Sequence, residues 1–87
     1  MTRMERLKQE AREIATRLGH RLGRFRPSVI TVEGPQPSQR PAAVAACELC
    51  GAVVLVDPAP AAGEEALSGE GVLRPCVAIE QEGHEMA

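Results

Sequence analysis

The stretch Cys47-Glu48-Leu49-Cys50-Gly51 decides how this chain of 87 residues folds. Two cysteines with two residues between them can direct both sulfurs at one point when the backbone turns tightly between two strands. Gly51 relaxes that turn, because glycine adopts a positive φ at little cost. Backbone N–H groups in such a turn point at the sulfurs, and zinc holds thiolates at about 2.3 Å in a tetrahedral site. The stretch therefore predicts half of a metal site between two short strands.

The rest of the site must come from distant parts of the chain. Cys76 follows Cys50 by 26 residues, on a strand predicted near the C-terminus. A closed structural zinc site needs a fourth ligand, and the two histidines are His20 and His84. We favour His20, because a ligand held between a helix and a strand loses less conformational entropy than one in a terminal tail. His84, a carboxylate, water and the absence of metal remain the alternatives.

Each of these residues also has an ordinary explanation when taken alone. A lone cysteine is often a small buried apolar residue, and a histidine after a helix is favoured by the helix dipole. The metal hypothesis therefore depends on the set. Iron is chemically possible at thiolates, but zinc is the default for mixed nitrogen and sulfur ligands. We expect one structural Zn2+.

The composition indicates that the fold needs a stabilising cross-link, either disulfides or a metal ion. The chain can form one domain at most, and Phe25 is its single aromatic residue. So short a chain usually needs disulfides or a metal. Three cysteines cannot all pair, and residues 1–23 lack the apolar segment of a signal peptide. We therefore expect a cytoplasmic protein that uses a metal, with no segment long enough to span a membrane.

An amphipathic helix is predicted at about residues 2–18. Thr2 and Glu5 have the spacing of a capping box, and Gly19 is suited to the position after the helix end. Apolar residues then recur at intervals of three and four. They are Met4, Leu7, Ala11, Ile14 and Leu18.

The remainder reads as short strands joined by proline-rich loops. Strand-like segments lie at 26–32, 44–47, 52–56 and 71–79, and prolines are expected to keep 34–41 and 57–63 irregular. The predicted fold class is α+β, with the N-terminal helix followed by a small antiparallel zinc-ribbon-like sheet of about three strands. One domain would span 1–79, with the ribbon at about 24–79. Residues 80–87 are predicted to be a disordered acidic tail.

The order of these motifs is shared with other small proteins. The relevant segments are Gly19–Phe25, Ala46–Gly51, Val53–Val56, Asp57–Pro60, Ser68–Gly69 and Cys76. Together they resemble a group of small, uncharacterised zinc-ribbon-like proteins of bacteria and phages, over roughly residues 10–77. The resemblance implies a three-stranded ribbon and a Cys3His site completed by His20, and it implies no catalytic activity. The chain departs from the pattern after Cys76, where a strand-like stretch and a tail with His84 follow.

No catalytic constellation is apparent. A redox CxxC motif starts a helix after a strand, whereas the residues after Cys50 predict a strand. A catalytic zinc needs an open coordination position and an acid or base. Glu48 is the nearest such group, and a lone glutamate in a turn is usually just solvated. We expect that the protein is not an enzyme.

The charge distribution bears on partners. Residues 1–26 hold eight basic and three acidic residues, and the remainder holds two basic and nine acidic ones. Four arginines, Arg17, Arg21, Arg24 and Arg26, offer contacts to phosphates, but base stacking would have only Phe25. We therefore favour a protein-interaction module. Non-specific nucleic-acid binding through the basic segment is the alternative, and a metal-free helix-plus-hairpin domain is the second alternative.

Overall fold

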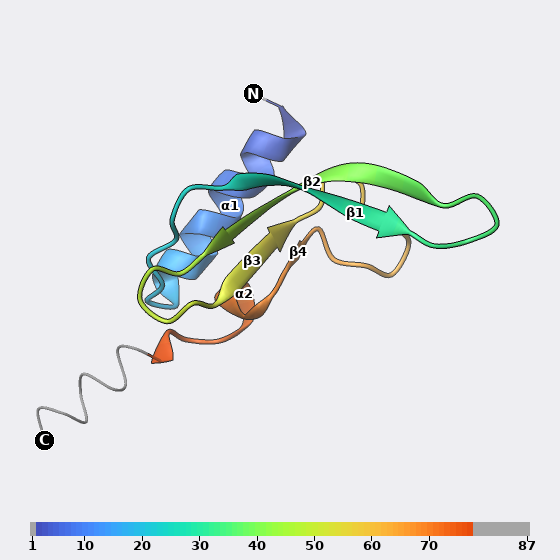
Figure 1. Ribbon diagram of the computed structural model, residues 1–87. Coiled ribbons are helices and arrows are strands. Elements are labelled where there is room, and N and C mark those ends of the chain that lie inside the picture. The colour runs from blue at the N-terminus through green and yellow to red at the C-terminus, as the bar shows by residue number, and fades with distance from the viewer. Residues whose placement is uncertain (1, 78–87) are drawn as a thin grey trace, which may run out of the picture.

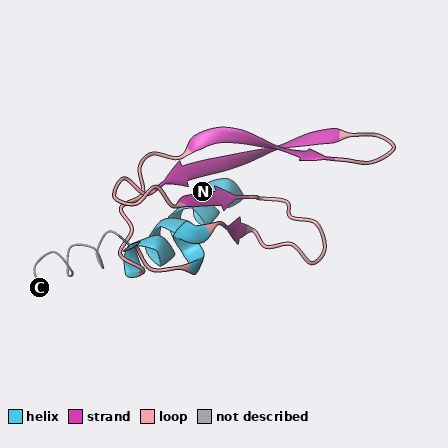
Figure 2. Cartoon of the chain, turned by 60° about the horizontal axis from the view of Figure 1, so that its bottom comes forward, coloured by secondary structure: helices cyan, strands magenta, loops and turns pink. Residues whose placement is uncertain are grey.

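A computed structural model describes residues 2–77 as a helix-covered antiparallel sheet (Figure 1). The sheet is a meander in the order β1-β2-β3-β4. Both helices contact β3 and each other, and Figure 2 shows them on one side of the sheet. The α+β prediction is therefore confirmed. The elements are α1 (Arg3–Arg17), β1 (Arg26–Val32), β2 (Ser38–Ala46), β3 (Val53–Val56), β4 (Leu67–Ser68) and α2 (Glu70–Leu73).

Helix α1 forms where the capping and apolar patterns predict it. The side chain of Thr2 accepts a hydrogen bond of 3.2 Å from the backbone N–H of Glu5, which satisfies one of the unpaired donors of the first turn. Leu7, Ala11 and Ala15 are buried along one face. Two of these three are alanines, so the helix backbone can lie close to β3.

Strand β2 begins earlier than predicted, so the expectation of an irregular segment through Pro41 is wrong. Pro41 pairs with Val29 of β1, whereas pairing between β2 and β3 begins only at Ala43. The edge of β2 at Pro41 that faces away from β1 therefore has no strand beside it. Proline is tolerated in a strand where its missing N–H would face no partner. The outer part of the β1–β2 hairpin, residues 29–41, is here called the arm, and it projects beyond α1 (Figure 1).

The predicted strand over 71–79 is also wrong in its described part, because residues 70–73 form α2. The last strand of the sheet is β4, which precedes the predicted segment in the chain and places Leu67 opposite Val56. Two glycines allow α2 to lie against β3. A Cβ added at Gly69 would collide with the Val53 carbonyl oxygen, and Gly69 has a φ of 100°. The sheet thus has four strands rather than about three, and residues 78–87, including the predicted tail, lie outside the described residues.

The core consists of small side chains. Val54, Val56 and Cys76 are the largest fully buried ones, and Phe25 is only half-buried against the cluster. Cys47 and Cys76 belong to the core themselves. The buried cluster is Leu7, Ala11, Ala15, Leu22, Ala43, Ala45, Cys47, Val54, Val56 and Cys76. So small a core leaves much of the stability to other interactions.

An ion pair fixes the proline-rich loop after β3, which is irregular as predicted. Arg40 donates to both carboxylate oxygens of the buried Asp57, at 3.2 and 2.7 Å. The backbone N–H of Ala59 adds a third hydrogen bond of 3.0 Å to Asp57. The hydrogen bonds from Arg40, and to a smaller extent the one from the N–H of Ala59, hold the pKa of Asp57 below its ordinary value. The ion pair therefore connects this loop to β2 while Asp57 is charged.

Candidate metal centre

The structure brings His20, Cys47, Cys50 and Cys76 together at one point. The ligand atoms of all four residues lie within 4.8 Å of one another, so the group could hold a metal ion. These are the four residues proposed from the sequence. His84, the alternative fourth ligand, lies outside the described residues.

His20 is placed by the end of α1. Its backbone N–H donates to the carbonyl of Ala15 at 2.9 Å, and the N–H of Gly19 donates to Thr16 at 3.0 Å. This pair of hydrogen bonds is a Schellman motif, and Gly19 has the positive φ of 86° that the motif requires. The hydrogen bonds at the end of α1 therefore fix the position of the His20 side chain. His20 is buried, with 5% of its surface exposed.

The orientation of the imidazole follows from a second contact. Nε2 of His20 lies 2.7 Å from the carbonyl oxygen of Arg74. A carbonyl only accepts hydrogen bonds, so Nε2–H is the donor, and in the neutral ring this leaves the lone pair on Nδ1. Nδ1 lies 3.5 Å from Sγ of Cys50, on the side of the sulfurs. Metal-ligating histidines are typically held by such a hydrogen bond through the other ring nitrogen.

The turn between β2 and β3 has the geometry that the CxxC spacing predicts. The N–H of Cys47 donates to the Ala52 carbonyl at 2.8 Å, and the N–H of Gly51 donates to the Cys47 carbonyl at 2.9 Å. Gly51 has a φ of 82°, which glycine adopts easily. The turn is also joined to the segment after His20, because Leu22 forms an isolated β-bridge with Cys47. Two ligand-bearing loops are thus held side by side.

Backbone N–H groups surround the sulfur of Cys47. Those of Arg21 and Leu49 each donate to it at 3.4 Å. Burial by itself would raise the pKa of Cys47, but the N–H groups of Cys50, Leu49 and Arg21 outweigh it and lower the pKa to about 6. The thiolate, which is the form that binds metals, is therefore favoured at neutral pH.

Cys76 reaches the site from a loop after α2 and not from a strand. Its backbone N–H donates to the carbonyl of Leu18, at the end of α1, with a length of 2.8 Å. Its Sγ lies 3.9 Å from Sγ of Cys47, and only 1% of the residue is exposed. The end of α1 therefore positions both His20 and Cys76.

The four ligands differ in their access to water. His20, Cys47 and Cys76 are buried, whereas Cys50 is half-buried and lines a hollow of about 200 Å³. Glu48 is exposed, and its side chain forms no hydrogen bond or ion pair within residues 2–77. The site therefore opens to water at Cys50, in a hollow that Glu70 and Arg74 also line.

Sequence reasoning missed the groups that hold the ligand loops. The guanidinium of Arg12 donates to the carbonyls of Leu22 and Gly23 at 3.0 and 3.2 Å, and it lies 5.3 Å from the centre of the Phe25 ring. It thereby ties α1 to the loop after His20. No sequence signal identifies these carbonyl contacts, because they depend on the tertiary fold.

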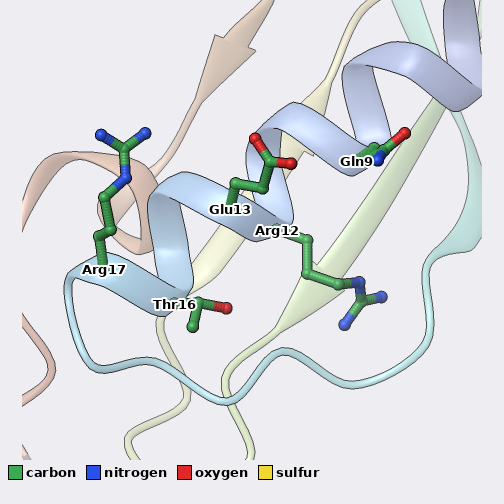
Figure 3. Close-up of a pocket in the computed structure, with 5 residues that line it drawn as sticks. All are labelled: Gln9, Arg12, Glu13, Thr16 and Arg17. Atoms are coloured by element: carbon green, nitrogen blue, oxygen red, sulfur yellow. The ribbon is translucent and has the colours of Figure 1, made fainter.

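A wider hollow of about 710 Å³ lies over the outer face of α1 (Figure 3). Arg12 and Arg17 point in different directions there, with Glu13 between them along the helix. The side chains do not converge on a common point, so this surface has no organised binding site.

The four arginines proposed for phosphate contact are exposed. None of them forms an ion pair within the part of the chain that the structure describes, whereas Arg40 does. They line separate hollows: Arg17 lies beside one, Arg21 beside another, and Arg24 and Arg26 beside a third. They do not form one pocket.

The site defines the chain as a small α+β domain with a Cys3His cluster suited to a metal ion. Comparisons with models of protein families, with curated proteins and with solved structures give no match to it. Within residues 2–77, the structure has no helix of the length and apolar character needed to cross a membrane.

Proposed function

We propose that this protein is a small zinc protein, in which Nδ1 of His20 and the thiolates of Cys47, Cys50 and Cys76 bind one structural Zn2+. The observation that carries the proposal is the spacing of the ligand atoms. Tetrahedral zinc with Zn–S near 2.3 Å and Zn–N near 2.05 Å separates two sulfurs by about 3.8 Å and a sulfur from a nitrogen by about 3.6 Å. The corresponding distances are 3.9 Å between Cys47 and Cys76 and 3.5 Å between Cys50 and His20.

A structural role is supported by what the ligands connect. They come from the end of α1, the β2–β3 turn and the loop after α2, so one ion would join all three. Four protein ligands leave no open position for a substrate, which favours a protein without catalytic activity. Metal binding then contributes directly to folding, because the unfolded chain has no site.

Protein interaction is the role in the cell that we favour. Exposed apolar side chains support it, with Leu73 at 72% exposure and Val29 at 58%. Three cysteines that form no disulfide suit a reducing cytoplasm. Kinship with the zinc-ribbon-like proteins of bacteria and phages is part of the same proposal, supported by the positions of the motif residues around the site.

Non-specific nucleic-acid binding is the second candidate, supported by the four exposed arginines without ion pairs. Such binding would weaken steeply with salt, because phosphate contacts release counterions. A fluorescence anisotropy titration with single-stranded and duplex DNA at several salt concentrations tests it. Binding that is unchanged after replacing all four arginines, Arg17, Arg21, Arg24 and Arg26, by glutamine would exclude this interface.

Native mass spectrometry of protein purified with reductant and without chelator tests the metal proposal. We expect one zinc per chain by mass and by elemental analysis. His20→Ala should lose the metal, and His84→Ala is the matched control that should retain it. Absence of metal from the wild-type protein, or loss only in His84→Ala, would overturn the proposed ligand set.

A further inference from the structure

We propose that the groove between α1 and α2 is a docking surface for a basic amphipathic helix of a partner protein. This proposal rests on the proposed role as an interaction module, and it identifies the surface and the chemistry of the partner. The groove has a volume of about 460 Å³. Its apolar part includes Ile14, Leu67, Val72 and Leu73, and its acidic part includes Glu10 and Glu65.

The apolar part of the groove is incompletely covered. Leu73 is 72% exposed, more than any other large apolar residue described. Ile14, Leu67 and Val72 beside it are only half-buried. On the α1 side, Leu7, Glu10 and Ile14 follow the spacing of one helix face, so the groove runs along α1. An elongated apolar groove of this kind accepts the apolar face of a helix.

The charge beside the groove selects the partner. Glu10 and Glu65 are exposed, and neither forms an ion pair within residues 2–77, whereas the neighbouring Glu64 pairs with Arg40. An apolar surface with unneutralised carboxylates is complementary to apolar anchors flanked by lysine or arginine. The same carboxylates disfavour a nucleic acid or an anionic membrane at this surface.

The chain itself does not supply such a partner. Helix α1 is basic, but its apolar face, Leu7, Ala11 and Ala15, is already buried within the domain. The α1 of a second copy therefore has no apolar face to offer. The C-terminal residues 78–87 contain Glu80, Glu82 and Glu85 and no lysine or arginine, so their charge has the same sign as that of the groove.

Fluorescence anisotropy with a labelled helical peptide of leucine and lysine, about 15 residues long, tests the proposal on the full-length protein. A peptide with glutamate in place of lysine is the control ligand. We expect saturable binding of the lysine peptide and weak binding of the glutamate peptide. Leu73→Ser should weaken binding about tenfold or more, and the double variant Glu10→Gln/Glu65→Gln should weaken it and reduce its dependence on salt.

Matched control variants lie on the arm. Val29→Ser removes another exposed apolar residue, and Glu33→Gln removes an exposed carboxylate. Both should bind the lysine peptide like the wild type. Equal losses in the arm variants, or equal binding of both peptides, would overturn the docking surface. Zinc content is measured on every sample, so that the two proposals can be separated. A zinc-loaded protein that does not bind the peptide refutes the docking surface alone. A wild-type protein that is purified without metal and binds the peptide refutes the zinc proposal alone.

Discussion

Removal of the proposed zinc ion should unfold the whole domain. A chain of 87 residues at about 0.05–0.15 kcal/mol per residue has a total stability of about 4–13 kcal/mol. Binding of structural zinc contributes about 10–16 kcal/mol at neutral pH, a range that overlaps the upper part of that total and extends beyond it. The remaining core cannot compensate, because its largest fully buried side chains are two valines and Cys76, itself a ligand.

Circular dichroism during chelation measures this directly. The protein is titrated with a strong zinc chelator in the presence of reductant, and the helical signal of α1 is followed together with a thermal melt. We expect loss of the helical signal and of the cooperative transition, and recovery of both on adding zinc. Cys47→Ser is the control, since a variant that is already metal-free should show no further change with chelator.

A metal-free protein that keeps its helical signal and melts cooperatively within a few degrees of the zinc-loaded form would refute the reasoning. Such a result would mean that the small core and the backbone hydrogen bonds around the site are sufficient for folding. The zinc would then be an addition to a domain that is already stable without it.

Three further substitutions test the fold around the site. Gly69→Ala should lower the free energy of unfolding, measured by urea denaturation, by about 2 kcal/mol or more, because it combines a strained φ with a backbone collision. Gly34→Ala is its control: there is open space around Gly34, so the free energy of unfolding should change by less than about 0.5 kcal/mol. Arg12→Ala should lower the free energy of unfolding by about 1–2 kcal/mol, because it removes the contacts of Arg12 with two carbonyls and with the Phe25 ring. Arg6→Ala is its control and should leave the free energy of unfolding unchanged. Asp57→Asn should destabilise the protein at neutral pH. Because the native pKa of Asp57 is lowered, the contribution of its charge is present above the unfolded pKa and is lost as pH falls through the native pKa. The difference between the urea midpoints of Asp57→Asn and wild type should therefore shrink at acid pH, and a constant difference would contradict it.

The sequence was most informative where local chemistry decides the structure. The capping pair Thr2 and Glu5 and the glycine after α1 define the helix by contacts within a few residues, and the CxxC turn is equally local. The set of candidate ligands could be chosen because the chain has only three cysteines and two histidines. Their assembly at one point depends on the tertiary fold, since Cys76 reaches the site from a loop and not from the predicted strand.

The errors occurred where tertiary contacts override local pattern. The apolar residues Val72 and Leu73 favoured a strand, but the chain passes close to Val53 at Gly69 and residues 70–73 form a short helix there. Pro41 indicated a loop, and only the absence of β3 beside it makes a strand possible. The Arg74 carbonyl that orients His20 carries no side-chain signal at all.

The positions of the ligands along the chain divide it into two loops of similar length. From His20 to Cys47 is 27 residues, and from Cys50 to Cys76 is 26. The entropy of closing a flexible loop grows only with the logarithm of its length, about 0.6 kcal/mol for each doubling. The turn of the arm lies inside the first loop, far from the ligands along the chain. Inserting about five residues there would add only about 0.15 kcal/mol to the closure term. The arm can therefore change in length during evolution while the proposed metal centre that closes the loop stays the same.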